Sequence, residues 1–392
     1  MVKRFPKDPT QKKRALLEAV ESVRDTLVLG AQEGEATATL PQASVDALYE
    51  SGLFALKTPQ VLGGAEADLV TQLEVIEAVS RIDPAAGWCL MIGAASVGNM
   101  GAYLPDEAIA EVFAGGRAPK TAGVFAPGGQ AVPAKGGYLV NGRWSFGSGI
   151  KHSEWLSAGA NLVVDDRVYP QQLRLAFPTA KAEIHETWQV MGLRGTGSCD
   201  FSVSDLFVPR QFSWNATESE PLRGGPLFRL GRPSNVTNEH SAFALGVGRR
   251  ALDAITELAR HKWRGYQNTT LVAERGVFQR ALGEDDLKLR AARSLAIEVL
   301  ESAWSVVARG DLLEPWQHSE MRSSATYSTQ VALEVTTQAF QYGGGSAMYS
   351  SNVLQQCLRD IHAAAQHRMV SDSAYEGHAQ FLLELPDADP LR

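Results

Sequence analysis

The spacing of hydrophobic positions changes twice along the chain and divides it into three regions. Over residues 10–117, apolar side chains recur every three or four positions, as on one face of a helix. One such stripe consists of Leu16, Val20 and Val23. We therefore predict a helical N-terminal domain over residues 1–118.

The second region, residues 120–209, has the alternation and the glycine turns of a β domain. Residues 201–204 alternate apolar with polar side chains, as in a half-buried strand. Gly136-Gly137 and Asn141-Gly142 are typical of tight turns between short strands. We predict a middle β-barrel or β-sandwich domain over residues 119–215.

Helical spacing returns from Glu239 onward. An apolar stripe runs at four-residue spacing from Tyr327 to Ala339, and Gly343-Gly344-Gly345 ends it. Stripes of this length predict a C-terminal four-helix bundle over residues 216–392. They often also form a subunit interface, so we expect a homodimer or homotetramer. The order of the three regions predicts an α+β fold.

A stretch without charged side chains between Asp83 and Asp106 is long enough to suggest a membrane helix. Glycine, serine and asparagine interrupt this stretch and Leu104-Pro105 ends it, so its apolarity is too low for a bilayer crossing. We predict a buried helix here and no membrane partner.

The composition favours a globular chain in a reducing compartment. Of the 392 residues 44% are hydrophobic and 21% are charged, with a formal net charge of −7, so we expect full-sized cores and no nucleic-acid partner. Three cysteines are too few and too widely spaced for a disulfide framework or a zinc site. We expect a cytoplasmic protein without a secretory signal, whose redox chemistry would need a borrowed cofactor.

Familiar hydrolase, phosphate-binding and metal motifs are absent from the sequence. It contains no Gly-x-Ser-x-Gly elbow between a strand and a helix, no phosphate loop ending in Lys and Ser or Thr, and no His-Glu-x-x-His. On a helix, His362 and His367 would point about 140° apart, so we predict no metal site.

Aromatic, glycine and hydroxyl residues are concentrated at two places in the β region. These are Trp144-Ser145-Phe146-Gly147-Ser148-Gly149 and the run from Trp188 to Ser198. A flat cofactor needs aromatic faces for packing, glycines for close approach and polar groups for its ring heteroatoms. The same composition also suits the core of a β domain, so composition alone leaves both interpretations open.

Several separated motifs, in the right order, resemble the acyl-CoA dehydrogenase fold superfamily. Asn141-Gly142-Arg143-Trp144 with the run to Gly149 is similar to the family's flavin strand, and Trp188 to Pro209 is similar to the segment that closes its β domain. Gly344-Gly345-Ser346-Ala347 with Arg359-Asp360 is similar to its C-terminal signature. The resemblance covers nearly the whole chain.

Within that superfamily the chain resembles the flavin-dependent monooxygenases, the two-component hydroxylases of phenols, indoles and related rings. Ala363-Ala364-Ala365-Gln366-His367 carries this likeness, and Val124 to Gln130 departs from the Thr-Glu-Pro and Gly-Ser-Asp pattern of the dehydrogenases. The resemblance implies reduced FMN or FAD, molecular oxygen as co-substrate and a separate flavin reductase as partner. It also implies hydroxylation of a small aromatic substrate through a flavin C4a-hydroperoxide.

The resemblance assigns roles to individual residues. It implies that Ser148 holds the flavin N5 position against loss of peroxide. It also implies that His367 lies beside the flavin, where an imidazole can donate a hydrogen bond or take a proton from a phenol or indole. A turn hydroxyl and a surface histidine are the structural alternatives. Further cofactor-binding residues implied in this way are Phe125, Trp144, Trp188, Arg264, Gln279, Gly344 and Gly345.

Two other functions remain open at this point. An acyl-CoA dehydrogenase needs a carboxylate base, and Tyr375-Glu376-Gly377 resembles the family's base segment, which makes Glu376 the candidate. It follows Asp360 by sixteen residues, a longer spacing than in the dehydrogenases. A non-enzymatic bundle protein, in contrast, would leave Ser148 and His367 away from any cavity.

Overall fold

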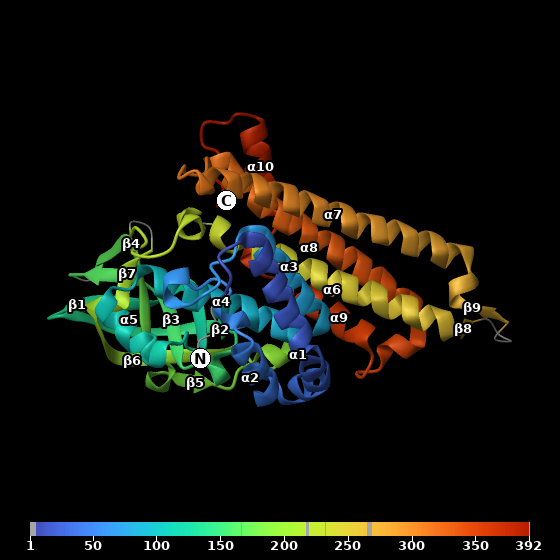
Figure 1. The fold of residues 1–392 in the computed structure, drawn as a ribbon, viewed down its shortest axis with the longest axis horizontal. Coiled ribbons are helices and arrows are strands. Elements are labelled where there is room, and N and C mark those ends of the chain that lie inside the picture. The colour runs from blue at the N-terminus through green and yellow to red at the C-terminus, as the bar shows by residue number, and fades with distance from the viewer. Residues whose placement is uncertain (1–4, 166, 217–218, 232, 265–268, 392) are drawn as a thin grey trace. The chain divides into compact units, whose positions relative to one another are not determined.

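Helices precede and follow one sheet along the chain in the computed structural model (Figure 1). The structure describes residues 5–165, 167–216, 219–231, 233–264 and 269–391. Their contacts form two units. The first comprises the described parts of Met1–Ala67, Trp88–Val190 and Arg194–Arg229, and the second those of Asp68–Gly87, Met191–Leu193 and Leu230–Arg392. The α+β fold class is confirmed, and the three-domain boundaries at 118 and 215 stay a prediction.

The helices of the first unit bury their apolar faces. They are α1 (Pro9–Thr37), α2 (Gln42–Glu50), α4 (Pro84–Tyr103, in this unit from Trp88 onward) and α5 (Asp106–Val112). Asp8 caps α1 with a side-chain hydrogen bond of 2.9 Å to a backbone N–H of the first turn. Leu16, Val20 and Val23 are buried, which confirms the predicted stripe.

The uncharged stretch forms α4 and is buried, as predicted. Of the helices in the described ranges, none has both the length and the apolarity that a membrane crossing requires. Glycines inside α4 admit the preceding loop. A Cβ at Gly98 would lie 3.0 Å from the Lys57 backbone oxygen, and one at Gly101 would lie 2.8 Å from the Pro59 ring. This close approach explains why glycine occurs in a helix interior despite its entropic cost.

Over the described residues, the β region forms one mixed sheet of seven strands in the order β5-β6-β2-β1-β3-β4-β7. Strands β1 and β3 pair in parallel, and the other neighbours pair antiparallel. Phe201 and Val203 are buried while Ser202 and Ser204 are not, which confirms the predicted alternation. The strands are β1 (Thr121–Ala134), β2 (Gly137–Gly147), β3 (Trp155–Val164), β4 (Arg167–Pro178), β5 (Glu183–His185), β6 (Cys199–Pro209) and β7 (Ser213–Asn215).

The tight turn predicted at Asn141-Gly142 is wrong, because β2 runs straight through these residues. The chain turns before β2, at Gly136 of the other predicted turn, where the φ of +84° favours glycine. Gly142 lies opposite Gly129 of β1, and the Trp144 ring packs against both. A Cβ at Gly142 would come 2.5 Å from the Gly129 Cα and 2.8 Å from the Trp144 ring. Glycine is needed here for packing and not for a turn.

Long helices that lie along one another dominate the second unit (Figure 1). α6 packs against α3, α7, α8 and α9. α8 ends at Gly343, and Gly344 has φ +56°, so the predicted glycine stop is confirmed. The elements are α3 (Leu69–Ile82), α6 (Ser234–His261), α7 (Gly276–Ala308), α8 (Pro315–Gly343), α9 (Val353–Ala364) and α10 (Ser373–Leu382), with the two-stranded pair β8 (Trp263–Arg264) and β9 (Thr270–Leu271).

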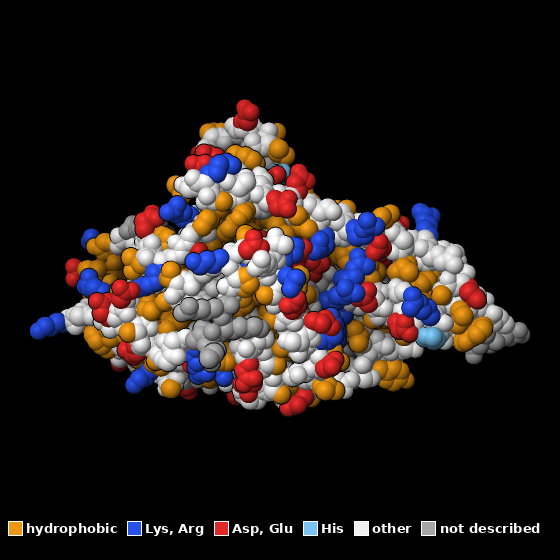
Figure 2. Space-filling view, in the orientation of Figure 1, with side chains coloured by type: hydrophobic (Ala, Val, Ile, Leu, Met, Phe, Trp, Pro, Cys, Tyr) orange, Lys and Arg blue, Asp and Glu red, His pale blue; other side chains and the backbone are white. Residues whose placement is uncertain are grey.

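Charged side chains of both signs are interspersed on the face drawn in Figure 2. In the second unit, ion pairs of this kind join Arg81 with Asp253 at 2.7 Å and Arg249 with Asp286 at 2.8 Å. Within each of these pairs the opposite charges offset one another.

The packing role of Gly142 can be tested by substitution. We expect Gly142→Ala to lower the free energy of unfolding by about 2 kcal/mol, because the added methyl group overpacks the sheet. The matched control is Gly283→Ala in α7, where an added Cβ meets no atom within 4 Å. That change should stabilise the protein by up to about 1 kcal/mol through helix propensity. Urea unfolding measures both, and an equal effect of the two substitutions would contradict the packing role.

Candidate active site

Ser148 lies just after β2 in a buried group of hydroxyls. Its Oγ accepts a hydrogen bond from the Trp88 indole N–H at 3.1 Å and lies 2.7 Å from Ser198 Oγ. Ser198 Oγ in turn lies 2.7 Å from Thr196 Oγ1. All four side chains are buried. Because each hydroxyl both donates and accepts, Ser198 can donate to Ser148 and leave the Ser148 proton for another acceptor.

Phe146, two residues earlier, holds an unusual backbone conformation. Its φ is +68° and its side chain is 69% exposed. A non-glycine residue in this region costs of the order of 1–3 kcal/mol, and such strain is concentrated at functional sites. The Trp188 ring meets the Phe146 ring edge-on, with centroids 6.2 Å apart. An exposed aromatic ring and a buried, hydrogen-bonded hydroxyl thus lie two residues apart in the chain.

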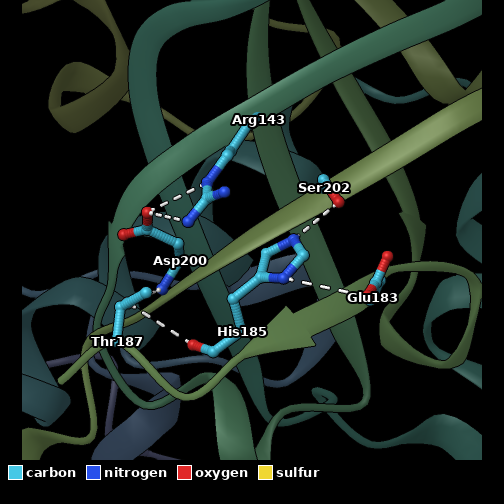
Figure 3. A network of polar contacts seen from close by, with 6 residues as sticks. All are labelled: Arg143, Glu183, His185, Thr187, Asp200 and Ser202. Carbon is cyan, nitrogen blue, oxygen red and sulfur yellow. Dashed lines mark hydrogen bonds and ion pairs between the residues drawn. The ribbon is translucent and has the colours of Figure 1, made fainter.

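A polar network on β2, β5 and β6 supports the segment that leads to Trp188 (Figure 3). Thr187 Oγ1 accepts the Asp200 backbone N–H at 3.0 Å, and His185 Nε2 lies 2.8 Å from Ser202 Oγ. These bonds attach the three-residue edge strand β5 and the residues after it to β6. Trp188 directly follows Thr187, so the network restricts where its ring can lie. The network comprises Arg143, Glu183, His185, Thr187, Asp200 and Ser202.

Trp144 and Phe125 occupy different surroundings from Phe146. Trp144 is 1% exposed, donates its indole N–H to the Gly159 carbonyl at 2.7 Å and stacks on Phe201. Its ring is committed to the core of the sheet. Phe125 is half-buried beneath the Arg174 guanidinium group, which lies 5.0 Å from the centre of its ring.

His367 lies beyond the end of α9, at the start of the 3-10 turn η11 (Arg368–Val370). The helical rotation assumed between His362 and His367 therefore does not apply. The Nδ1 atom of His367 accepts the Met369 backbone N–H at 3.2 Å. Its ring packs on that of His240 in α6, with centroids 4.3 Å apart and planes inclined by 35°. Sequence reasoning did not identify His240.

Burial keeps both imidazoles neutral. It lowers the pKa of His367 to about 4. The pKa of His240 lies well below its ordinary value, first because of burial and then because a charge on His367 would repel a second proton. At neutral pH the pair carries no charge.

The predicted residues near the glycine stop partly come together. Arg264 donates to the Tyr342 carbonyl at 3.2 Å, and a Cβ at Gly344 would clash with the same guanidinium group. Gly345 is exposed, with open space where a Cβ would lie. Gln279 bonds the Ala273 carbonyl at 2.9 Å. The cation beside Gly344 and the open backbone at Gly345 suit a phosphate group.

Two motifs that are distant in sequence meet on α9. The Asp360 carboxylate, itself buried, accepts the Leu193 backbone N–H at 2.6 Å. A Cβ at Gly192 would collide with the Arg359 carbonyl, so only glycine permits this contact. The Arg-Asp signature thus has a structural role in holding Met191–Leu193.

Glu376 is exposed in the first turn of α10. The neighbouring Tyr375 donates to Gln330 Oε1 at 2.8 Å. A base that abstracts a proton from carbon works best where water is excluded. The surroundings of Glu376 do not supply that condition.

A surface groove of about 520 Å³ lies in the first unit and includes none of the predicted site residues. Its walls are mostly apolar, with Lys7 the charged residue among them. It is lined by Phe5, Lys7, Gln60, Val61, Leu62, Gly63, Gly64, Ile109, Ala110, Phe113 and Gly116.

The predicted site residues are distributed over both units. The first contains Phe125, Trp144, Ser148 and Trp188, and the second contains Arg264, Gln279, Gly344, Gly345 and His367. Within the first unit, the exposed Phe146 ring and the oriented Ser148 hydroxyl match what a flavin needs, namely a flat apolar contact and a donor for ring heteroatoms. Phe146 belongs to the aromatic run from Trp144 to Gly149, but the family resemblance assigns the cofactor contact there to Trp144 and not to Phe146.

Comparison with known proteins decides the family. Residues 10–109 match the acyl-CoA dehydrogenase N-terminal domain, and residues 239–372 match the acyl-CoA dehydrogenase C-terminal domain. Indole-3-acetate monooxygenase of Pseudomonas putida is 30% identical over 91% of this chain and 90% of its own. The chain belongs to the flavin-dependent monooxygenases of this fold. The resemblance predicted from motifs is confirmed.

Two further members support this monooxygenase assignment. The flavin-dependent monooxygenase oxygenase subunit HsaA of Mycobacterium tuberculosis is 26% identical and covers 90% of this chain and 91% of its own. XiaF from Streptomyces sp., solved in complex with FADH2 and glycerol, is 26% identical, with a TM-score of 0.90 and 98% coverage of both chains. The enzyme class, a flavin-dependent oxidoreductase, is therefore established for the chain.

The hydrogen bond between the Ser148 and Ser198 hydroxyls can be tested by a double-mutant cycle. Ser148→Ala leaves the buried Trp88 N–H without its acceptor, which should cost about 1–3 kcal/mol of unfolding free energy. With Ser198→Ala added, we expect the losses to fall short of additivity by about 1 kcal/mol, because the two hydroxyls share one bond. The control cycle combines Ser148→Ala with Ser153→Ala. Because Ser153 bonds Ile150 and Thr179 and not Ser148, the two losses of unfolding free energy should add. Additive losses for Ser148 and Ser198 would refute the bond.

Proposed function

We propose that this monooxygenase takes reduced FMN or FAD from a separate reductase and hydroxylates a small aromatic or heteroaromatic substrate with molecular oxygen. The observation that carries this proposal is a strained, exposed Phe146 ring two residues before the buried, hydrogen-bonded Ser148 hydroxyl, in a chain of this family. The names of relatives support the finer points. One acts on indole-3-acetate, another is an oxygenase subunit, and the XiaF complex contains FADH2.

The bound reduced flavin would supply the two electrons that activate oxygen. Phe146 and Trp188 pack against its ring system and keep water away from that face. Ser148 would donate a hydrogen bond from its hydroxyl to a ring heteroatom, while Ser198 and Trp88 donate hydrogen bonds to Ser148 Oγ. Preorganised donors of this kind need no rearrangement as charge develops.

We propose, as the family resemblance implies, that His367 serves the flavin and the substrate as a donor or acceptor at the reacting oxygen. Burial keeps the His367 imidazole uncharged at neutral pH. This suits an apolar aromatic substrate, because a charged imidazole would lose its water, at a cost in free energy, when the substrate bound. We propose that Arg264, Gly344, Gly345 and Gln279 bind the phosphate end of the cofactor. We also propose that the enzyme assembles as two or four copies.

The alternative function, an acyl-CoA dehydrogenase, receives less support from the structure. Glu376 would have to act as the base, and it is exposed on α10. The relatives that are 30% and 26% identical to this chain are named monooxygenases.

The proposed function predicts a specific order of binding. Titration without oxygen should show that reduced FMN or FAD binds more tightly than the oxidised form. Admission of ¹⁸O₂ with a panel of phenols and indoles should then place one labelled oxygen atom in the product, as measured by mass spectrometry. Reduction of tightly bound FAD by an acyl-CoA, without labelled product, would instead establish the dehydrogenase.

The two predicted catalytic residues can be tested through coupling. We expect Ser148→Ala and His367→Ala to lower hydroxylated product per oxygen consumed by about 100-fold, with peroxide released instead, because a positioned donor is lost. Product and peroxide are measured in the same reaction. Glu376→Gln is the control and should hydroxylate normally. Unchanged coupling in either alanine variant would remove that residue from the proposal.

A further inference from the structure

His240, which is buried, and His367, which is half-buried, form a pair of imidazoles in the second unit. His240 projects from α6 and is 5% exposed. The ring centroids lie 4.3 Å apart and the ring planes are inclined by 35°, so the two rings are in contact.

The hydrogen bond at Nδ1 decides which nitrogen of His367 carries the proton. Nδ1 accepts the Met369 backbone N–H at 3.2 Å, so it holds a lone pair and not a proton. A neutral imidazole then bears its hydrogen on Nε2. In this tautomer Nε2 can donate a hydrogen bond and cannot take up a proton.

We propose that His240 is a positioning residue that packs against His367 and keeps it a neutral hydrogen-bond donor through Nε2. Its role rests on the proposed function, since His367 then donates to an oxygen of the substrate or cofactor and does not deprotonate the substrate. The sequence analysis allowed both roles for His367, and the geometry selects the donor.

The surroundings of the pair are consistent with a neutral state. η11 packs against α6 and α8. Of the charged residues on these elements, Glu239 precedes His240 and Arg368 follows His367 in the chain, and Arg322 belongs to α8. Arg322 bonds the Arg368 carbonyl at 3.3 Å. The lowered pKa of His367 has burial as its cause, and the His240 ring is part of what buries it.

The test observes His367 directly by NMR, in protein without flavin that contains ¹⁵N-labelled histidine. His367→Asn identifies the resonance. We expect ¹⁵N shifts of a neutral ring with the proton on Nε2 throughout pH 5.5–8, as a pKa of about 4 requires. A proton on Nδ1, or a cationic ring at pH 6, would overturn the proposal.

Substitution of His240 isolates its contribution. In His240→Ala we expect the pKa of His367 to rise by about one unit or more toward its ordinary value, because water replaces the ring. His240→Phe keeps a flat ring there and should leave the titration low, and it serves as the test if His240→Ala does not fold. The control is His318→Ala, which removes another imidazole, half-buried and bonded to Ser234 of α6. It should leave His367 unchanged, and an identical titration in His240→Ala and the unsubstituted protein would refute the role of His240.

Hydroxylation assays separate this inference from the proposed function. If His367 shows the neutral Nε2 tautomer but no phenol or indole is hydroxylated, the proposed function fails and the positioning role of His240 stands. If hydroxylation proceeds while His367 is cationic at neutral pH, the positioning role fails and the proposed function stands.

Discussion

Withdrawing polar side chains from water is the constraint on which both candidate site regions depend. A buried hydroxyl or amide without a hydrogen-bond partner costs about 1–3 kcal/mol of stability. The protein must therefore supply a partner for each such group. In the first unit the Trp88 indole, Ser148 and Ser198 satisfy one another. In the second unit the Asp360 carboxylate is satisfied by a backbone N–H, and the histidine pair avoids the cost by losing its charge. These solutions leave few orientations open to the side chains, which is what preorganisation requires.

Close packing inside the sheet decides which aromatic ring is available to a ligand. The glycines that face Trp144 leave space for its ring in the core, and its hydrogen bond to the Gly159 carbonyl holds it there. The register of β2 against β6 then shifts between Trp144 and Gly147. Phe146 lies within this shift, at positive φ, and its ring remains exposed. One irregularity at the end of a strand thus separates a structural aromatic residue from one that can contact a cofactor.

Membership in a fold family leaves the reaction open, because acyl-CoA dehydrogenases and oxygen-using hydroxylases share this fold. What distinguishes them is the chemistry of particular side chains. Here the carboxylate required by the dehydrogenase reaction, Glu376, is exposed, whereas His367 is partly buried and uncharged. The proposed role of His367 as an uncharged donor suits oxygen transfer to an aromatic ring better than it suits abstraction of a proton from carbon. Identity to monooxygenases over nine-tenths of the chain agrees with that comparison.

The sequence by itself determined the order of helices and strands, the buried α4 and the family, because these follow from periodicity and from motifs that are local in the chain. It predicted a turn at Asn141-Gly142 where packing against Gly129 and Trp144 requires glycine within a strand. It also offered no sign of the contact between His240 and His367, which lie on separate segments. Only the tertiary structure decided which imidazole meets which, which aromatic ring is exposed and which hydroxyls are linked. These depend on neighbours brought together by folding, and a pattern along one chain segment carries no information about them.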